Sequence, residues 1–375
     1  MKRINFGGIE CGAESLKNLI SCWTSTWVSG GKLVKKFEDK WSKMFGYAAS
    51  VAMSSGTDAD IQACIALYDF GAKRGDEIIV PACAFIATAN SILAAGFKPV
   101  FVDIEIETLN INPDLIEAAI TDKTVAIMAV HTMGKPCDMV KIMGIAKAHN
   151  LKVIEDCCEA HGAEIKDEFI GKFGDFATFS FYQAHLVNCA EGGMVSVNNP
   201  EYADILRSTR CHGRIMDGTN YFDFPRYGLN SKMNDLEASF GLEGLEKFQN
   251  TFTFRQMNYY DLIEEFSTLK DKFFISEQDE EVTNSPHAFS ITIKDPNKYN
   301  FKVFHDYMME NGIEVKRNFG STPTQHKSFE WMGHKLGDFP EAEYVGSHGL
   351  HFGIHQGLSM KDVEYISKTV KEFFV

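Results

Sequence analysis

The chain has 375 residues, of which 45% are hydrophobic and 23% charged, a composition typical of a folded protein of one or two domains. Its formal charge of -14 argues against nucleic acid as a partner, because phosphate backbones are bound by clustered Lys and Arg. The N-terminus carries no apolar signal core and no apolar run reaches spanning length, so we expect a cytoplasmic protein that does not enter a membrane. The nine cysteines lack CxxC or CxC spacing, which predicts reduced thiols and no metal site.

The first half of the chain predicts an α/β fold. A helix is expected over 13–28, and Phe37, Trp41 and Phe45 recur at helical spacing in the segment that follows. Short apolar strands then alternate with helices, which indicates a mostly parallel sheet covered on both faces, with ligands at the carboxyl ends of its strands. The expected strands are 77–80, 99–104, 124–130 and 151–154, and the expected helices are 86–95, 113–120 and 139–149.

In the second half of the chain, the pattern of predicted strands and helices changes near residue 250. A strand at 193–197, a helix at 201–210, a polar loop at 211–232 and a helix at 233–248 complete the α/β pattern. Strand and helix patterns of another kind follow at 289–293 and 304–310. We therefore predict a large three-layer α/β/α domain over 1–250 and a smaller α+β domain over 251–375.

Two local patterns carry chemistry, and each has a plain structural alternative. The turn Ser54-Ser55-Gly56-Thr57 enters an apolar helix and offers free backbone N–H groups to an anion; taken alone, a simple helix cap is the better explanation. His185 stands between the apolar strand 179–181 and the turn Glu191-Gly192-Gly193. A lone histidine after such a strand is more often structural than catalytic.

Taken in chain order, the motifs are more specific than any one of them. The chain resembles the sugar aminotransferase family of DegT/DnrJ type, which are fold type I pyridoxal-phosphate enzymes. The resemblance runs from about residue 5 to the C-terminus, and implies a homodimer with shared active sites. The residues that carry it are Ser54-Ser55-Gly56-Thr57, Pro81 to Asn90, His131, Gly134, Pro136, Glu155-Asp156, Ala160-His161-Gly162-Ala163, Gly174-Asp175, Phe179-Ser180-Phe181, Ala190-Glu191-Gly192-Gly193, Gly228-Leu229-Asn230 and Asp235.

The resemblance implies a role for each of several residues. Asp156 matches the carboxylate that keeps the pyridine nitrogen of the cofactor protonated, and Phe85 matches the aromatic ring stacked on the cofactor. The remaining matches concern the cofactor phosphate, with Asn230 crossing to the phosphate of the neighbouring subunit. These phosphate-binding residues are Gly56, Thr57, Ser180 and Asn230.

His185 departs from the aminotransferase pattern. The family's aminotransferases carry there the lysine that binds the cofactor covalently, and no lysine occurs between Lys172 and Lys232. Imidazole cannot form that link, but it is a good base near neutral pH. A small branch of the family, the sugar 3-dehydratases typified by GDP-4-keto-6-deoxymannose 3-dehydratase, carries histidine at this position. The resemblance to that branch makes His185 the expected catalytic base.

Smaller features concern the resemblance to the 3-dehydratase branch. Glu159 stands where aminotransferases usually carry glutamine near the cofactor, and Gly353-Ile354-His355-Gln356 resembles a motif of the dehydratase. Lys232 replaces a common arginine, and the segment at Arg317 differs from the usual Arg-Pro. We expect Lys232, Arg317 and His355 near the nucleotide-sugar or the amino donor.

The sequence leaves three hypotheses open. The first is a 3-dehydratase that removes the C3 hydroxyl of a nucleotide-linked 4-keto-6-deoxyhexose, with an amino acid such as glutamate regenerating pyridoxamine phosphate. The second is a nucleotide-sugar aminotransferase that tolerates histidine, which would retain the amine in its product. The third is a cofactor-binding homologue without catalysis; the intact Asp156, Phe85 and Ser180 argue against it.

Overall fold

The computed structural model describes residues 3–8, 11–215, 222–276 and 279–374. A seven-stranded sheet lies at its centre, in the order β1-β9-β8-β5-β4-β2-β3. Only β9 runs antiparallel to its neighbours, so the sheet is mostly parallel, as predicted. The strands are β1 (Ala49–Met53), β2 (Glu77–Pro81), β3 (Lys98–Val102), β4 (Thr124–Val130), β5 (Lys152–Asp156), β8 (Phe176–Ser180) and β9 (Gly193–Val197).

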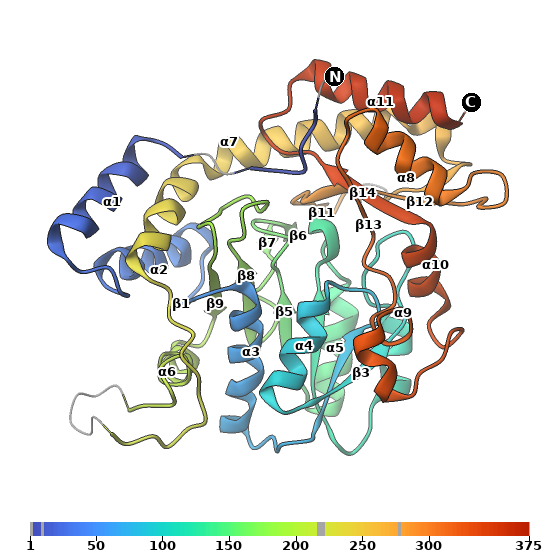
Figure 1. Ribbon diagram of the computed structural model, residues 1–375. Coiled ribbons are helices and arrows are strands. Elements are labelled where there is room, and N and C mark those ends of the chain that lie inside the picture. The colour runs from blue at the N-terminus through green and yellow to red at the C-terminus, as the bar shows by residue number, and fades with distance from the viewer. Residues whose placement is uncertain (1–2, 9–10, 216–221, 277–278, 375) are drawn as a thin grey trace.

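Helices cover both faces of this sheet because successive strand residues are apolar on both sides (Figure 1). In β4, for example, Met128 joins the core on one face and Ile127 the core on the other. The first core includes α3 (Gly56–Ala66), α4 (Ile86–Ala95) and α6 (Pro200–Thr209). The second includes α2 (Lys32–Phe45), α5 (Met139–His149) and the first half of α7 (Asp235–Glu265). The predicted three-layer α/β/α architecture is confirmed.

A smaller α+β unit lies against one end of the large sheet (Figure 1). Its antiparallel sheet has the order β10-β12-β14-β13, and its core is separate from the two cores of the large sheet. Its elements are β10 (Phe273–Phe274), β12 (Ala288–Ile293), β13 (Val315–Arg317), β14 (Gly349–Gly353), α8 (Phe301–Glu310) and α11 (Met360–Phe374). Between β13 and β14 lie α9 (Thr322–Gln325) and α10 (Pro340–His348), and Ala342 and Val345 of α10 join the first core of the large sheet. A third, three-stranded sheet consists of β6 (Glu164–Ile165), β7 (Glu168–Phe169) and β11 (Val282–Thr283).

Several predicted boundaries are wrong for local reasons. Helix α1 (Ala13–Ser25) ends three residues before 28, because Thr26 adopts a left-handed conformation with φ 58°. The segment 113–120 forms two 3₁₀ turns, Pro113–Leu115 and Glu117–Ala119, in place of one α-helix. The strand before His185 begins at Phe176 rather than at Phe179.

Helix α7 also runs well past the predicted end at residue 248. Asn234 and Glu237 form a capping box at its start, and the helix then continues for 31 residues to Glu265. Residue 250, the predicted domain boundary, therefore lies inside a continuous helix that contacts both α2 and α11. We propose that the change of domain occurs along α7. Among the described residues, no helix combines the length and apolar composition needed to cross a bilayer.

Trp41 of α2 is the central side chain of the second core. It is fully buried, its ring lies 4.6 Å from that of Phe45 and 4.9 Å from that of Phe179, and its indole N–H donates to Ser196 Oγ at 3.2 Å. We expect Trp41→Ala to lower the free energy of unfolding by about 3–5 kcal/mol, measured by urea denaturation. Trp331→Ala, at a position that is 66% exposed, is the matched control and should change it by less than about 0.5 kcal/mol. Equal effects of both changes would contradict this assignment of the core.

Candidate active site

A cavity of about 430 Å³ opens at the carboxyl ends of the parallel strands. Strand pairing places Val130, Asp156 and Thr178 side by side at this edge, and the smaller unit closes the cavity from the other side. Of the predicted site residues, the cavity is lined by Gly56, Thr57, Phe85, Asp156, Glu159, Ser180, His185 and Arg317. The sheet edge therefore brings together residues that lie far apart in the sequence.

One part of the cavity is suited to an anion. Gly56 begins α3, and Ser55 caps this helix by accepting a hydrogen bond from the Asp58 N–H at 3.0 Å. The first N–H groups of a helix have no acceptor within it, so those of Gly56 and Thr57 can bind a ligand. A Cβ at Gly56 would lie 2.5 Å from Ser180 Cβ, so only glycine permits this approach of helix and strand. These groups fit a phosphate.

Another part of the cavity holds two buried carboxylates. Asp156 accepts hydrogen bonds from Thr88 Oγ1 at 3.0 Å and from the Cys158 N–H at 3.2 Å. Asp60, from α3, accepts one from Thr178 Oγ1 at 2.6 Å. Burial raises the pKa of both carboxyls, and the negative charge of Asp156 raises that of Asp60 further. Buried carboxylates of this kind favour a cationic partner, and a protonated ring nitrogen is such a partner.

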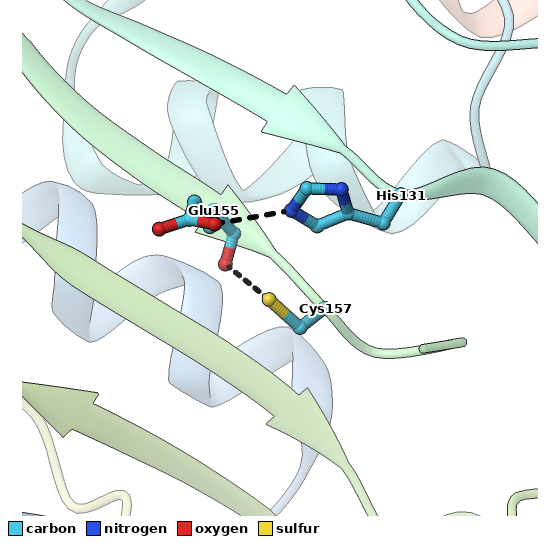
Figure 2. Close-up of side chains that lie close together, drawn as sticks. All are labelled: His131, Glu155 and Cys157. Atoms are coloured by element: carbon cyan, nitrogen blue, oxygen red, sulfur yellow. Dashed lines mark hydrogen bonds and ion pairs between the residues drawn. The ribbon is translucent and has the colours of Figure 1, made fainter. Parts of the chain in front are cut away.

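A histidine and a glutamate, His131 and Glu155, lie together at the ends of β4 and β5 (Figure 2). The Cys137 N–H donates to His131 Nδ1 at 3.0 Å, so Nε2 carries the proton and donates to Glu155 Oε2 at 3.3 Å. Glu155 also accepts backbone N–H groups from Gly171, Phe173 and Gly174. Cys157 Sγ lies beside them and donates to the Glu155 backbone oxygen at 3.5 Å. The ring nitrogens and the carboxylate are thus engaged in hydrogen bonds, which makes the cluster a structural support.

His185 projects from the segment after β8 and lines the cavity. Its backbone N–H donates to the Tyr182 oxygen at 2.9 Å, which fixes the turn that carries the ring. Its Nδ1 is buried and has no hydrogen-bond partner among the described residues. Burial lowers the pKa of this imidazole well below its usual value, and nearby His161, Arg255 and Lys316 lower it further. His185 is therefore a neutral base with a free ring nitrogen.

The structure adds residues that the sequence patterns did not identify. His287, just before β12, lines the same cavity, and its ring lies 4.9 Å from the His185 ring. His351 and Lys316 reach the cavity from the small sheet, and Asp60 reaches it from α3. His287 and His351 had no local signal, because each is a single histidine far from the other motifs. The cavity joins them to His185 only after folding.

Three predicted residues lie outside the lining of this cavity. Asn230 and Lys232 are exposed beside the end of β1, where Lys232 forms a bridge with Met53. His355 is half-buried, and its Nε2 lies 3.1 Å from the Asn5 backbone oxygen. Their expected roles stay predictions. An exposed Asn230 is compatible with a contact to a second subunit.

The sequence and the fold of this chain are similar to those of several known proteins. Residues 10–371 match the DegT/DnrJ/EryC1/StrS aminotransferase family. GDP-perosamine synthase of Escherichia coli O157:H7 is 32% identical, with 94% of this chain and 93% of the relative covered. GDP-4-keto-6-deoxy-D-mannose 3-dehydratase of Escherichia coli O55:H7 is 30% identical, with 91% and 92% covered. A solved structure of GDP-4-keto-6-deoxymannose-3-dehydratase, a mutant with bound GDP-perosamine, has a TM-score of 0.89 at 26% identity, with 98% and 99% covered.

The chain therefore belongs to the DegT/DnrJ/EryC1/StrS aminotransferase family, as the motifs predicted. It is a pyridoxal-phosphate-dependent, sugar-modifying enzyme, and its cofactor is pyridoxal 5'-phosphate with its amine form, pyridoxamine 5'-phosphate. The relatives include both an aminotransferase and a 3-dehydratase. Family membership thus establishes the cofactor and leaves the reaction to be decided at the site.

Glu159 should make the stability of the cofactor-free protein fall as the pH rises through neutrality. Its side chain is 14% exposed, and burial raises its pKa from 4.5 to about 7. Between these values the folded state binds more protons than the unfolded state, so rising pH lowers stability. From about pH 5.5 to about pH 8, Glu159 should remove about 2 kcal/mol from the free energy of unfolding.

The comparison of wild type with Glu159→Gln isolates this effect. The buried His161, His185, His287 and His351 have lowered pKa values, so they stabilise the fold as pH rises through the unfolded value of 6.5, with the opposite sign. These histidines are present in both proteins. The difference between the two free energies of unfolding, measured with urea across this pH range, therefore reports the ionisation of Glu159. Parallel pH profiles of the two proteins would show that Glu159 ionises as an ordinary surface glutamate.

Proposed function

We propose that the enzyme is a 3-dehydratase acting on a nucleotide-linked 4-keto-6-deoxyhexose. The observation that carries the proposal is an imidazole, His185, in a cavity whose other groups fit the cofactor. The family resemblance implies a lysine at this position in aminotransferases. The nearest lysines in sequence are Lys172 and Lys232, and neither is among the residues that line the cavity.

The geometry indicates which residues would hold the cofactor. The N–H groups of Gly56 and Thr57, with the hydroxyl of Ser180, would bind its phosphate, and Asp156 would pair with its ring nitrogen. Phe85, 60% exposed at the start of α4, would lie against the ring. When bound, the cofactor supplies an amino group for the 4-keto carbon and a ring that accepts electrons.

His185 would act as the base and not as an anchor. Because burial and nearby cations disfavour its cationic form, its ring is uncharged at neutral pH. It would remove a proton from the exocyclic carbon of the cofactor and leave the electron pair to the cofactor ring. The C3–O bond then breaks with its electron pair on oxygen, which leaves as water after protonation. Overall, the sugar loses its C3 oxygen while glutamate, the proposed amino donor, becomes 2-oxoglutarate and ammonia.

We also propose a homodimer with shared active sites. In sequence, the exposed Asn230 follows three exposed aromatic residues, Phe222, Phe224 and Tyr227. Aromatic side chains are enriched at protein interfaces, so exposed ones in this segment support a contact with a second subunit. GDP-perosamine synthase and GDP-4-keto-6-deoxy-D-mannose 3-dehydratase are relatives, so a GDP-linked sugar is the first substrate to test.

Product analysis distinguishes the candidate reactions. Purified protein is incubated with pyridoxal phosphate, glutamate and a panel of GDP- and dTDP-linked 4-keto-6-deoxyhexoses, and the products are measured by mass spectrometry. We expect a sugar that has lost the C3 oxygen and contains no added nitrogen, formed in equal amount to 2-oxoglutarate. An amino sugar would support the alternative aminotransferase and overturn the proposal.

Replacing His185 tests the proposed base. We expect His185→Asn to keep cofactor binding within a few fold, followed by absorbance, and to lower the rate of C3–O cleavage by about 10²–10⁴-fold. Full activity of this variant would exclude His185 as the base.

Borohydride treatment of the wild type tests for a covalent anchor. Lys316 lines the cavity, so a link to this lysine would be trapped by reduction and found by peptide mass spectrometry. We expect no such adduct. A cofactor trapped on Lys316 would show that the protein holds its cofactor covalently after all.

A further inference from the structure

His287 is one of three histidines that line the cavity, and the guanidinium of Arg255 holds it beside His185. The two rings are 4.9 Å apart between centroids and tilted by 42°. The buried guanidinium of Arg255 donates to the His287 backbone oxygen at 3.2 Å, to the Ala184 oxygen at 2.8 Å and to the His185 oxygen at 3.5 Å. One side chain of α7 thus fixes both histidine-bearing segments.

The His287 ring has an open nitrogen and a carboxyl neighbour. Its Nδ1 is buried and has no hydrogen-bond partner in the part of the chain described. Its Nε2 lies 3.9 Å from Glu159 Oε1, a separation that a small movement would reduce to a hydrogen bond. Glu159 Oε2 accepts the Met133 N–H at 2.7 Å, which fixes the carboxyl. A buried imidazole with such surroundings is poised to exchange protons.

We propose that His287 is a second acid–base residue, which passes a proton from the Glu159 carboxyl to the C3 hydroxyl of the sugar. The inference rests on the proposed dehydratase function and divides its acid–base work between two histidines. His185 removes the proton from carbon, and His287 protonates the departing oxygen. Nothing is oxidised or reduced in this proton relay.

The transfer balances without a cation forming on His287. Its Nδ1–H donates to the oxygen as the C3–O bond breaks, its Nε2 takes the proton of Glu159, and water leaves. Glu159 ends as a carboxylate and His185 holds the proton taken from carbon. Exchange with solvent then returns both groups to their neutral forms, so the net proton count does not change.

The charges around His287 favour an imidazole that passes a proton on over one that remains protonated. Burial lowers the pKa of His287 well below its usual value, and His185, Arg255, His351 and Lys316 lower it further. The pKa of Glu159 is raised to about 7, so its carboxyl retains a proton close to neutral pH. The proton therefore resides on Glu159 and crosses the imidazole only during the reaction.

The proposal is tested by measuring two half-reactions of the His287→Asn variant separately: formation of pyridoxamine phosphate from glutamate, and C3–O cleavage of the sugar. With glutamate alone, this variant should convert pyridoxal phosphate to pyridoxamine phosphate within about threefold of the wild-type rate, measured by absorbance. With sugar added, C3–O cleavage should fall by about 10²-fold or more. Proton exchange at carbon in deuterium oxide, measured by mass, should continue, because His185 is intact. His185→Asn should lose both half-reactions.

Three controls separate the possible failures. His287→Gln serves if the asparagine variant unfolds, and His305→Asn removes an imidazole of α8 that does not line the cavity and should have no effect. Histidine NMR of the cofactor-free protein should show the pKa of His287 rising in His185→Asn, because His185 lowers it. Equal losses in both half-reactions, or unchanged C3–O cleavage, would overturn the role of His287. An amino-sugar product from wild type would overturn the dehydratase function instead.

Discussion

The buried guanidinium of Arg255 connects the parts of the molecule that form the site. It belongs to α7, the helix that contributes to the core of the large sheet and contacts α11 of the smaller unit. Besides the three backbone oxygens at Ala184, His185 and His287, it donates to Gln356 Oε1 at 3.4 Å. Burial lowers its pKa only to about 10, so it stays charged at neutral pH. A buried charge is tolerated only when it is well hydrogen-bonded, which ties these segments to one geometry.

The charged groups differ between the two parts of the cavity. The carboxyls of Asp60 and Asp156 meet at the strand ends, while Arg255 and Lys316 lie near the imidazoles. The pair of carboxyls is suited to a cationic ring nitrogen. Burial, together with the nearby cations, keeps the imidazoles neutral, so that their ring nitrogens can accept a proton. Opposite charge environments in one cavity are a common way to assign acid and base roles.

Local patterns in the sequence predicted much of the fold and part of the site. Short apolar strands alternating with helices indicated the mostly parallel sheet, and the resemblance to the family identified Asp156, Ser180 and His185 as site residues. Local pattern did not reveal Asp60, which lies within an apolar helix, or His287, whose neighbours in space come from distant segments. The extent of α7 was also missed, because its second half packs on the smaller unit and its pattern differs there. Tertiary contacts decide such features, and a single sequence does not display them.

The same fold supports both retention and loss of the amine, so the reaction depends on the groups that face the sugar once it is bound. A lysine at position 185 would offer a primary amine that can recapture the cofactor and return nitrogen to the sugar. An imidazole offers no such route, and a buried imidazole does not keep a proton for long, because its cationic form is disfavoured. That proton is then lost to solvent, while the proposed relay through His287 protonates the leaving oxygen. On the proposed mechanism, replacing an amine by a buried imidazole thus removes both the covalent anchor of the cofactor and the route by which nitrogen returns to the sugar, and both losses favour elimination over transfer.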